Sequence, residues 1–151
     1  MPIRCEIVSQ DRMVWSGEAD MVVVPGAGGE MGILPNHAPL LSTLKPGIIK
    51  VVHQGKEEYF TVTGGVVEVR PEKVTVLADA SEHVSEIDVQ RAEAARQRAE
   101  ELLKQAPPTT AEHLAAQAAL QRARIRLEAA RRFRPKRGPQ IQSGPADEEQ
   151  G

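Results

Sequence analysis

The spacing of apolar residues changes period near residue 85, and this change constrains the fold more than any other feature of the sequence. Before it, the chain holds short runs rich in β-branched residues, separated by turn-forming pairs such as Pro25-Gly26 and Pro46-Gly47. Short strands without an intervening helix are typical of a sandwich or flattened barrel. We expect strands over residues 3–8, 21–24, 48–53, 58–63, 66–69 and 74–78. Gly64-Gly65 predicts a tight two-residue turn, because such turns require positive φ.

After residue 85, apolar residues recur at intervals of three and four, which predicts helices. One seam consists of Ala92, Ala95, Ala99, Leu102, Leu103 and Ala106, and the next of Ala116, Ala119, Leu120, Ala123, Leu127 and Ala130. Pro107-Pro108 ends the first helix, because proline lacks the N–H and clashes with the preceding turn. Two helices with so short a connection fold back as an antiparallel hairpin.

Both expected helices have capping signals at their starts. Ser85 followed by Asp88 has the spacing of an N-cap and its partner carboxylate, and Thr109 with Glu112 repeats this spacing. The seams are mainly alanine, however, and burying one methyl-sized group contributes only about 0.8 kcal/mol, against roughly 1.5–3 for a leucine. We therefore expect two stable helices whose mutual arrangement is weakly fixed.

The balance of basic and acidic residues also changes near residue 85. Residues 1–85 carry 7 basic and 11 acidic side chains, whereas residues 86–134 carry 10 basic and 7 acidic ones. We predict an α+β protein with an N-terminal β-sandwich or flattened barrel over 1–84 and a C-terminal two-helix hairpin over 85–134. Residues 135–151 are rich in Pro, Gly, Gln and acidic residues, which predicts a disordered tail.

The sequence contains no pattern typical of a catalytic, metal or membrane-spanning site. Cys5 is the only cysteine, so an internal disulfide is excluded. The four histidines lack close metal-ligand spacing, and no serine has the context of a nucleophile. No apolar run approaches the roughly 20 residues needed to cross a bilayer, and we find no secretory signal. We expect a non-catalytic protein that requires no cofactor and meets a membrane only through a partner.

Glycine and proline are concentrated in residues 26–39. The first part, Gly26-Ala27-Gly28-Gly29-Glu30, fails both common phosphate-loop patterns, because Met31 replaces a third glycine and no Gly-Lys-Ser/Thr follows. The backbone-restricting residues of 29–39 instead predict an exposed loop of fixed shape that presents Glu30 and His37.

This run closely resembles the signature loop of the epsilon subunit family of F-type ATP synthases, called delta in mitochondria. The resemblance covers about residues 3–134. Because the family's loop faces the membrane rotor ring, the resemblance implies that Glu30 and His37 contact the c-ring. Asn36 stands where the family commonly has glycine, and asparagine tolerates left-handed backbone geometry.

The stretch Ile87-Asp88-Val89-Gln90-Arg91-Ala92 matches the family's nucleotide motif, Ile/Leu-Asp-x-x-Arg-Ala. The resemblance implies ATP as a regulatory ligand, with arginines of both helices forming a fork suited to phosphates. The residues implied are Glu82, Ile87, Asp88, Arg91, Arg98, Arg122 and Arg126. Ala115 departs from the pattern, because some ATP-binding relatives carry arginine there. Alternatively, Asp88 only caps the first helix, and the arginines only form solvated helix surfaces without binding a ligand.

The resemblance also implies partners and location. The sandwich is expected to bind the γ subunit and the c-ring, and the hairpin to extend beside γ to the α/β catalytic head and inhibit ATP hydrolysis. As part of the central stalk, the protein would couple proton translocation to ATP synthesis. It would lie at the cytoplasmic face of the cell membrane as a peripheral part of the complex.

Arginines crowd the second helix, and this stretch leaves other functions open. Its cations are Arg122, Arg124, Arg126, Arg131, Arg132, Arg134, Lys136 and Arg137. A nucleic-acid adaptor is one alternative, but the cations surround the whole helix and Phe133 is the only aromatic residue among them. Acidic surfaces of the catalytic β subunits fit them better, so we expect no nucleic-acid partner. A free-standing ATP-sensing module is the other alternative.

Overall fold

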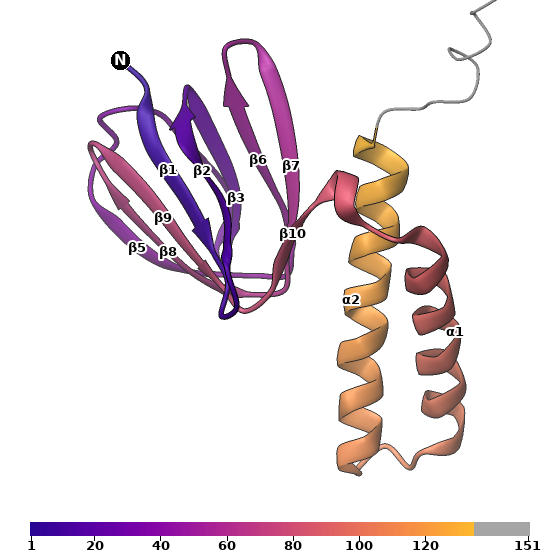
Figure 1. Cartoon of the computed structure of the whole chain (residues 1–151). Coiled ribbons are helices and arrows are strands. Elements are labelled where there is room, and N and C mark those ends of the chain that lie inside the picture. Colours follow the sequence, from indigo (N-terminus) through magenta and orange to yellow (C-terminus); the bar gives the residue numbers. More distant parts are fainter. Residues whose placement is uncertain (135–151) are drawn as a thin grey trace, which may run out of the picture.

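Ten β-strands form one sheet that curves round on itself into a sandwich, and two helices follow it (Figure 1). The computed structural model describes residues 1–134, so the predicted tail over 135–151 lies outside the described residues. The strands are β1 (Ile3–Val8), β2 (Met13–Ala19), β3 (Met21–Gly26), β4 (Gly29–Ile33), β5 (Leu40–Leu44), β6 (Gly47–His53), β7 (Lys56–Val62), β8 (Gly65–Arg70), β9 (Lys73–Ala78) and β10 (Ser81–His83). They pair in the order β10-β7-β6-β3-β5-β8-β9-β1-β2, with β4 paired to β3 beside this path. The predicted α+β class, a β-sandwich followed by a helical hairpin, is confirmed.

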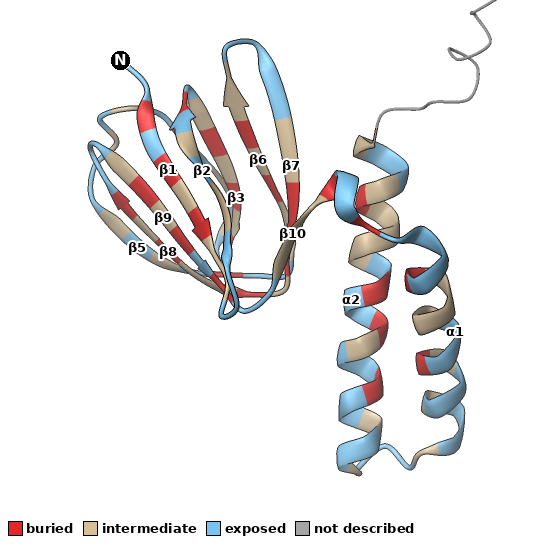
Figure 2. Ribbon diagram, viewed as in Figure 1, coloured by how far each residue is buried: buried red, intermediate tan, exposed pale blue. Residues whose placement is uncertain are grey.

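The interior of the sandwich is filled by alternate residues of its strands, because successive side chains of a strand point to opposite faces. Figure 2 shows this alternation along β1 and β9. Large side chains are fully buried there, among them Phe60, Ile3, Ile7, Ile33 and Ile49. Each such side chain stabilises the fold by about 1.5–3 kcal/mol. The sandwich is therefore a firmly packed body against which the hairpin can dock.

All six predicted strands are present, with ends within two residues of those expected. Four further strands, β2, β4, β5 and β10, lack the runs of β-branched residues that identify a strand in the sequence. The predicted loop over 29–39 is partly wrong, because its first five residues form β4. Ile33 pairs with Val22 of β3, and its side chain is buried in the core. The remaining turn has Asn36 at φ 66°, a left-handed geometry that asparagine tolerates.

Gly64 and Gly65 have the positive φ values, 128° and 139°, that the predicted turn requires. The strands on either side of this turn, β7 and β8, do not pair with each other. β7 lies between β10 and β6, whereas β8 lies between β5 and β9. The two glycines carry the chain from one part of the sheet to another. A Cβ atom at Gly65 would lie 2.2 Å from the carbonyl oxygen of Leu77, so this close approach requires glycine.

A 3₁₀ turn, η1 (Val84–Glu86), leads from β10 to the helix α1 (Val89–Gln105). Asp88 caps α1, because its Oδ1 accepts a hydrogen bond from the backbone N–H of Arg91 at 3.1 Å. The predicted cap at Ser85 is wrong. Ser85 lies inside η1, where Glu86 accepts a hydrogen bond from the backbone N–H of His83 at 3.2 Å and closes a separate turn.

The helix α2 (Ala111–Phe133) follows Pro107-Pro108, which ends α1 as predicted. Thr110, rather than Thr109, caps α2 and accepts from the backbone N–H of His113 at 3.2 Å. Within residues 1–134, neither helix is long and apolar enough to cross a membrane.

Most buried residues of α1 and α2 lie on the sides of the two helices that face each other (Figure 2), and most of them are alanine. Those on the facing sides are Ala92, Ala99, Ala116, Leu120 and Ala123. The prediction that Leu102 belongs to this seam is wrong, because its side chain is 51% exposed. Leu103 is only partly buried. Small side chains contribute little burial, so the interface holds two intrinsically stable helices together weakly.

The C-terminal end of α2 holds the hairpin against the sandwich (Figure 1). Phe133 stacks on Tyr59 of β7, with ring centroids 4.1 Å apart and planes 14° from parallel. Nη2 of Arg134 donates to the carbonyl oxygen of Val84 at 2.9 Å and to that of Ile87. A small apolar cluster surrounds the rings: Val84, Ile87, Ala129, Ala130 and Ile48. The apolar contact between the hairpin and the sandwich is thus confined to this small cluster, and the loop between the helices lies far from it (Figure 1).

Phe133→Ala is expected to loosen docking without unfolding the sandwich. A stacked aromatic pair contributes about 0.5–1.5 kcal/mol beyond the area that it buries, and the truncation also removes the burial of the ring. Amide hydrogen exchange in η1 and the last turns of α2 should become at least about tenfold faster, since tenfold corresponds to 1.4 kcal/mol. Exchange in the sandwich core should not change. Leu114→Ala is the control, because it removes a 63% exposed side chain near the start of α2. Equal exchange in the two variants would contradict the docking role of Phe133.

Candidate functional site

A cavity of about 380 Å³ lies between the sandwich and the hairpin. The sandwich contributes residues of β7, β10 and the turn between β1 and β2, and the hairpin contributes residues of both helices. The main polar side chains that line it are Arg12, Thr61, Thr63, Glu82, Arg122 and Arg126. The volume is within the range of small-molecule pockets. Its walls belong to both halves of the chain, so the cavity has this shape only while the hairpin is docked.

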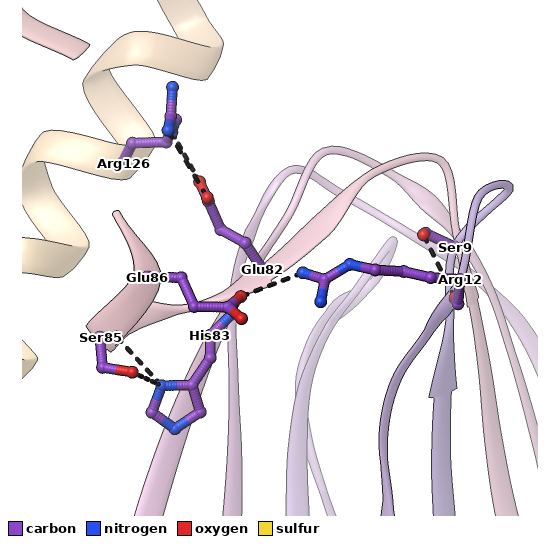
Figure 3. Close-up of polar contacts among 7 residues, drawn as sticks. All are labelled: Ser9, Arg12, Glu82, His83, Ser85, Glu86 and Arg126. Carbon is purple, nitrogen blue, oxygen red and sulfur yellow. Dashed lines mark hydrogen bonds and ion pairs between the residues drawn. The ribbon is translucent and has the colours of Figure 1, made fainter. Parts of the chain in front are cut away.

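Glu82 of β10 and Arg126 of α2 join the two walls. Nε of Arg126 donates to Oε2 of Glu82 at 2.6 Å, and Nη2 lies 3.5 Å from Oε1 (Figure 3). Arg122 lines the same cavity one helical turn earlier. Within residues 1–134, the ion pairs of α2 involve four other arginines and not Arg122. The Arg122 guanidinium therefore has donors available for a ligand.

Arg12 reaches the cavity from the turn between β1 and β2. Its Nη2 donates to Oε1 of Glu86 at 3.0 Å (Figure 3). This hydrogen bond holds the pKa of the Glu86 carboxyl below its ordinary value, so the carboxylate is ionised at neutral pH. No motif in the sequence identifies Arg12, because 74 positions separate it from Glu86 and only the fold brings them together.

The residues that the nucleotide motif implies lie in three places. Glu82, Arg122 and Arg126 meet at the cavity. Ile87 is buried in the docking cluster and Asp88 caps α1, so both shape the connection to the hairpin rather than line the cavity. Arg91 and Arg98 are exposed on α1 and do not line the cavity. The docked hairpin therefore brings together the arginine pair of α2 but not that of α1.

His83 fixes the turn that connects the two halves. The backbone N–H of Ser85 donates to Nδ1 of His83 at 3.0 Å, so Nδ1 is the acceptor (Figure 3). Nε2 therefore carries the proton, which it donates to Oε1 of Glu58 at 3.0 Å. His53 shares the same carboxylate, with its Nε2 2.8 Å from Oε2. Burial raises the pKa of Glu58, but its interactions with both histidines, hydrogen bonds above all, outweigh this effect and leave the pKa below its ordinary value.

The cavity combines guanidinium groups with apolar walls formed by Ala95, Ala119 and Ala123. Guanidinium groups bind phosphate and carboxylate in a fork geometry, so the cavity suits an anionic ligand that also has an apolar part. Within residues 1–134, no group of three or more His, Cys, Asp and Glu side chains has the arrangement to hold a metal ion.

Glu30 and His37 lie on the surface of the sandwich, Glu30 on a strand and His37 in the turn that follows that strand. Glu30 is exposed on β4, opposite Pro25 of β3. His37 lies in the turn between β4 and β5, with Nδ1 2.8 Å from the carbonyl oxygen of Ala38. The turn is anchored, because the backbone N–H of Asn36 donates to the carbonyl oxygen of Pro71 at 2.9 Å. The fixed shape expected of residues 29–39 therefore comes from a strand followed by an anchored turn.

The two halves of the chain match the two domains of one protein family. The β-sandwich domain of the ATP synthase delta/epsilon chain matches residues 2–84, and its long alpha-helix domain matches residues 85–131. The chain therefore belongs to the delta/epsilon chain family of ATP synthases. Within this family it is of the epsilon type, a subunit of an F-type ATP synthase.

Similar proteins carry the same description. The chain is 44% identical to the ATP synthase epsilon chain of Acidithiobacillus ferridurans over 134 residues, which is 89% of this chain and 94% of that one. It is 46% identical to the epsilon chain of Herpetosiphon aurantiacus over 132 residues, 87% and 96% of the two chains. A chain in the cryo-EM structure of the Euglena gracilis mitochondrial ATP synthase (OSCP, F1 and c-ring) has a similar structure. The TM-score is 0.72 at 25% identity, over 85% of this chain and 81% of that chain.

Glu58→Gln is expected to change how stability depends on pH. The folded-state pKa of Glu58 lies below the unfolded value of about 4.3, so its ionised form stabilises the fold above that value. This contribution is lost as the pH falls through the folded-state pKa. Urea unfolding should show the variant on the order of 1–2 kcal/mol less stable near pH 5.5, with the difference shrinking below about pH 4.

Glu72→Gln provides the control for this titration, because Glu72 is exposed and forms no ion pair within residues 1–134. Its unfolding free energy should follow that of the wild type at every pH. A difference between Glu58→Gln and the wild type that stays constant with pH would show that the carboxylate of Glu58 is not the titrating group.

Proposed function

We propose that this chain is a non-catalytic rotor component of the central stalk that helps to couple proton translocation to ATP synthesis. The sandwich, residues 1–84, would bind the γ subunit and the c-ring, with Glu30 and His37 at the ring contact. Similarity to a chain of an assembly that contains F1 and the c-ring supports this assignment. The subunit would lie at the cytoplasmic face of the cell membrane, as a peripheral part of the complex.

The hairpin, residues 85–134, is the regulatory part of the proposal. While the hairpin is docked on the sandwich, it does not obstruct rotation of the central stalk. Released, it would extend beside γ to the α/β catalytic head and block hydrolytic rotation. Two observations support such an exchange. The interface between α1 and α2 is mainly alanine, and the apolar contact between the hairpin and the sandwich is confined to the small cluster around Phe133.

ATP is the proposed ligand of the cavity. The observation that carries this assignment is the meeting of Glu82, Arg122 and Arg126 between two walls that belong to different halves of the chain. A ligand that binds only the docked state stabilises it by about 2.7 kcal/mol at a hundred times its dissociation constant. This free energy is comparable with that of a stacked ring pair and its surroundings. The ATP concentration would therefore determine which state is populated.

Arg122→Ala and Arg126→Ala are each expected to weaken ATP binding at least about tenfold, since a hydrogen bond to a charged group contributes about 1.5–3 kcal/mol. Isothermal titration calorimetry on the purified chain measures this affinity. Arg124→Ala is the matched control, because Arg124 lies on the same helix, is 65% exposed and does not line the cavity. Unchanged affinity in both test variants would refute the ATP site. Arg91→Ala tests the motif separately, and the family resemblance predicts that it too weakens binding.

Deletion of the chain after residue 86 is expected to raise the ATP hydrolysis rate of the assembled enzyme, because the truncated subunit keeps the sandwich but lacks the inhibitory hairpin. Steady-state ATPase assays on the reconstituted complex measure this rate. A subunit that ends at residue 134 is the control, since it keeps both helices. If the shorter subunit assembles and the hydrolysis rate matches that of the control, the hairpin is not an inhibitor in this protein.

A further inference from the structure

Arginines face the cavity from both of its walls. Arg12 belongs to the sandwich, whereas Arg122 and Arg126 belong to α2. In Figure 3, Arg12 and Arg126 approach the segment that carries Glu82 and Glu86 from opposite sides. A ligand in this cavity therefore meets positive charge from two parts of the chain that only docking brings together.

Arg12 uses a small part of its hydrogen-bonding capacity. A guanidinium group has five N–H donors, and within residues 1–134 the Arg12 side chain donates from Nη2 alone, to Glu86. The side chain is 47% exposed, so its other donors remain accessible. Glu86 thus occupies one end of the guanidinium and leaves most of its donors for a further acceptor.

Positive charge exceeds negative charge around the cavity. Among the described residues that line it, three are arginines and Glu82 is the only acidic one, already paired with Arg126. Glu86 offsets part of the charge of Arg12 from outside the lining. Arg12 and Arg122 still place like charges on facing walls, which opposes docking. An anionic group between them reverses this effect, because both guanidinium groups then bind it.

We propose that Arg12 is a ligand-binding residue of this site, which contacts the phosphate groups of the nucleotide from the sandwich side. Through Arg12 the nucleotide links the sandwich to α2, and this link makes ligand binding favour the docked hairpin. The inference rests on the proposed ATP site and adds to it a residue outside the family motif.

Calorimetric titration of the full-length chain with ATP tests the proposal with four proteins: the wild type, Arg12→Ala, Glu86→Gln and Arg70→Ala. Arg12→Ala is expected to weaken ATP binding about tenfold. Arg70→Ala is expected to have no effect, because Arg70 is a sandwich arginine paired with Glu68 at 3.1 Å outside the cavity. All variants are at exposed positions, and circular dichroism verifies their folding.

Glu86→Gln distinguishes two possible roles of Arg12: direct binding of ATP, and positioning of η1 through Glu86. It breaks the same ion pair as Arg12→Ala but keeps the guanidinium, so ATP affinity should stay within about twofold of the wild type or rise. Unchanged affinity in Arg12→Ala, or an equal loss in Arg12→Ala and Glu86→Gln, would overturn the role of Arg12 while leaving the ATP site intact. Absence of ATP binding to the wild type would overturn the ATP site itself and this inference with it.

Discussion

Phe133 lies flat against Tyr59, and Arg134 donates to the carbonyl oxygens of Val84 and Ile87 beside it. This contact sets where α2 lies relative to the sandwich, and the other features of the site follow from it. Arg122 and Arg126 reach the cavity only because α2 is held there, and Arg126 meets Glu82 for the same reason. Since both walls are needed, the proposed ligand site exists only while the hairpin is docked, and a ligand bound there would oppose release.

The two halves of the chain differ in how they are stabilised. The sandwich buries large β-branched and aromatic side chains throughout, whereas the hairpin buries mostly alanine. Such a difference permits the hairpin to leave its position while the sandwich stays folded. Between them, η1 is held by Glu58 through His83 and by Arg12 through Glu86. Both of these anchors come from the sandwich, so the connection is fixed to the sandwich rather than to the hairpin.

The sequence predicts the fold class and the division near residue 85, because a strand period of two and a helical period near 3.6 are visible without tertiary information. It misses β4, whose glycines and methionine resemble a loop until β3 pairs with them. Gly64-Gly65 shows positive φ as predicted, but the partner strands of β7 and β8 depend on the closure of the whole sheet. At the site, the family resemblance implies Glu82, Arg122 and Arg126, which the structure brings to the cavity. The resemblance does not indicate Arg12, because its place depends on a contact between residues 74 positions apart.

If nucleotide binding and hairpin docking form one equilibrium, as proposed, hydrogen exchange with mass spectrometry will detect their coupling. The wild-type chain is labelled with and without saturating ATP. We expect slower exchange in η1 and the C-terminal half of α2 when ATP is present, with exchange in the sandwich core unchanged. If ATP binds and the exchange of η1 and α2 stays the same, or changes in step with the sandwich core, the coupling of ligand to docking is contradicted.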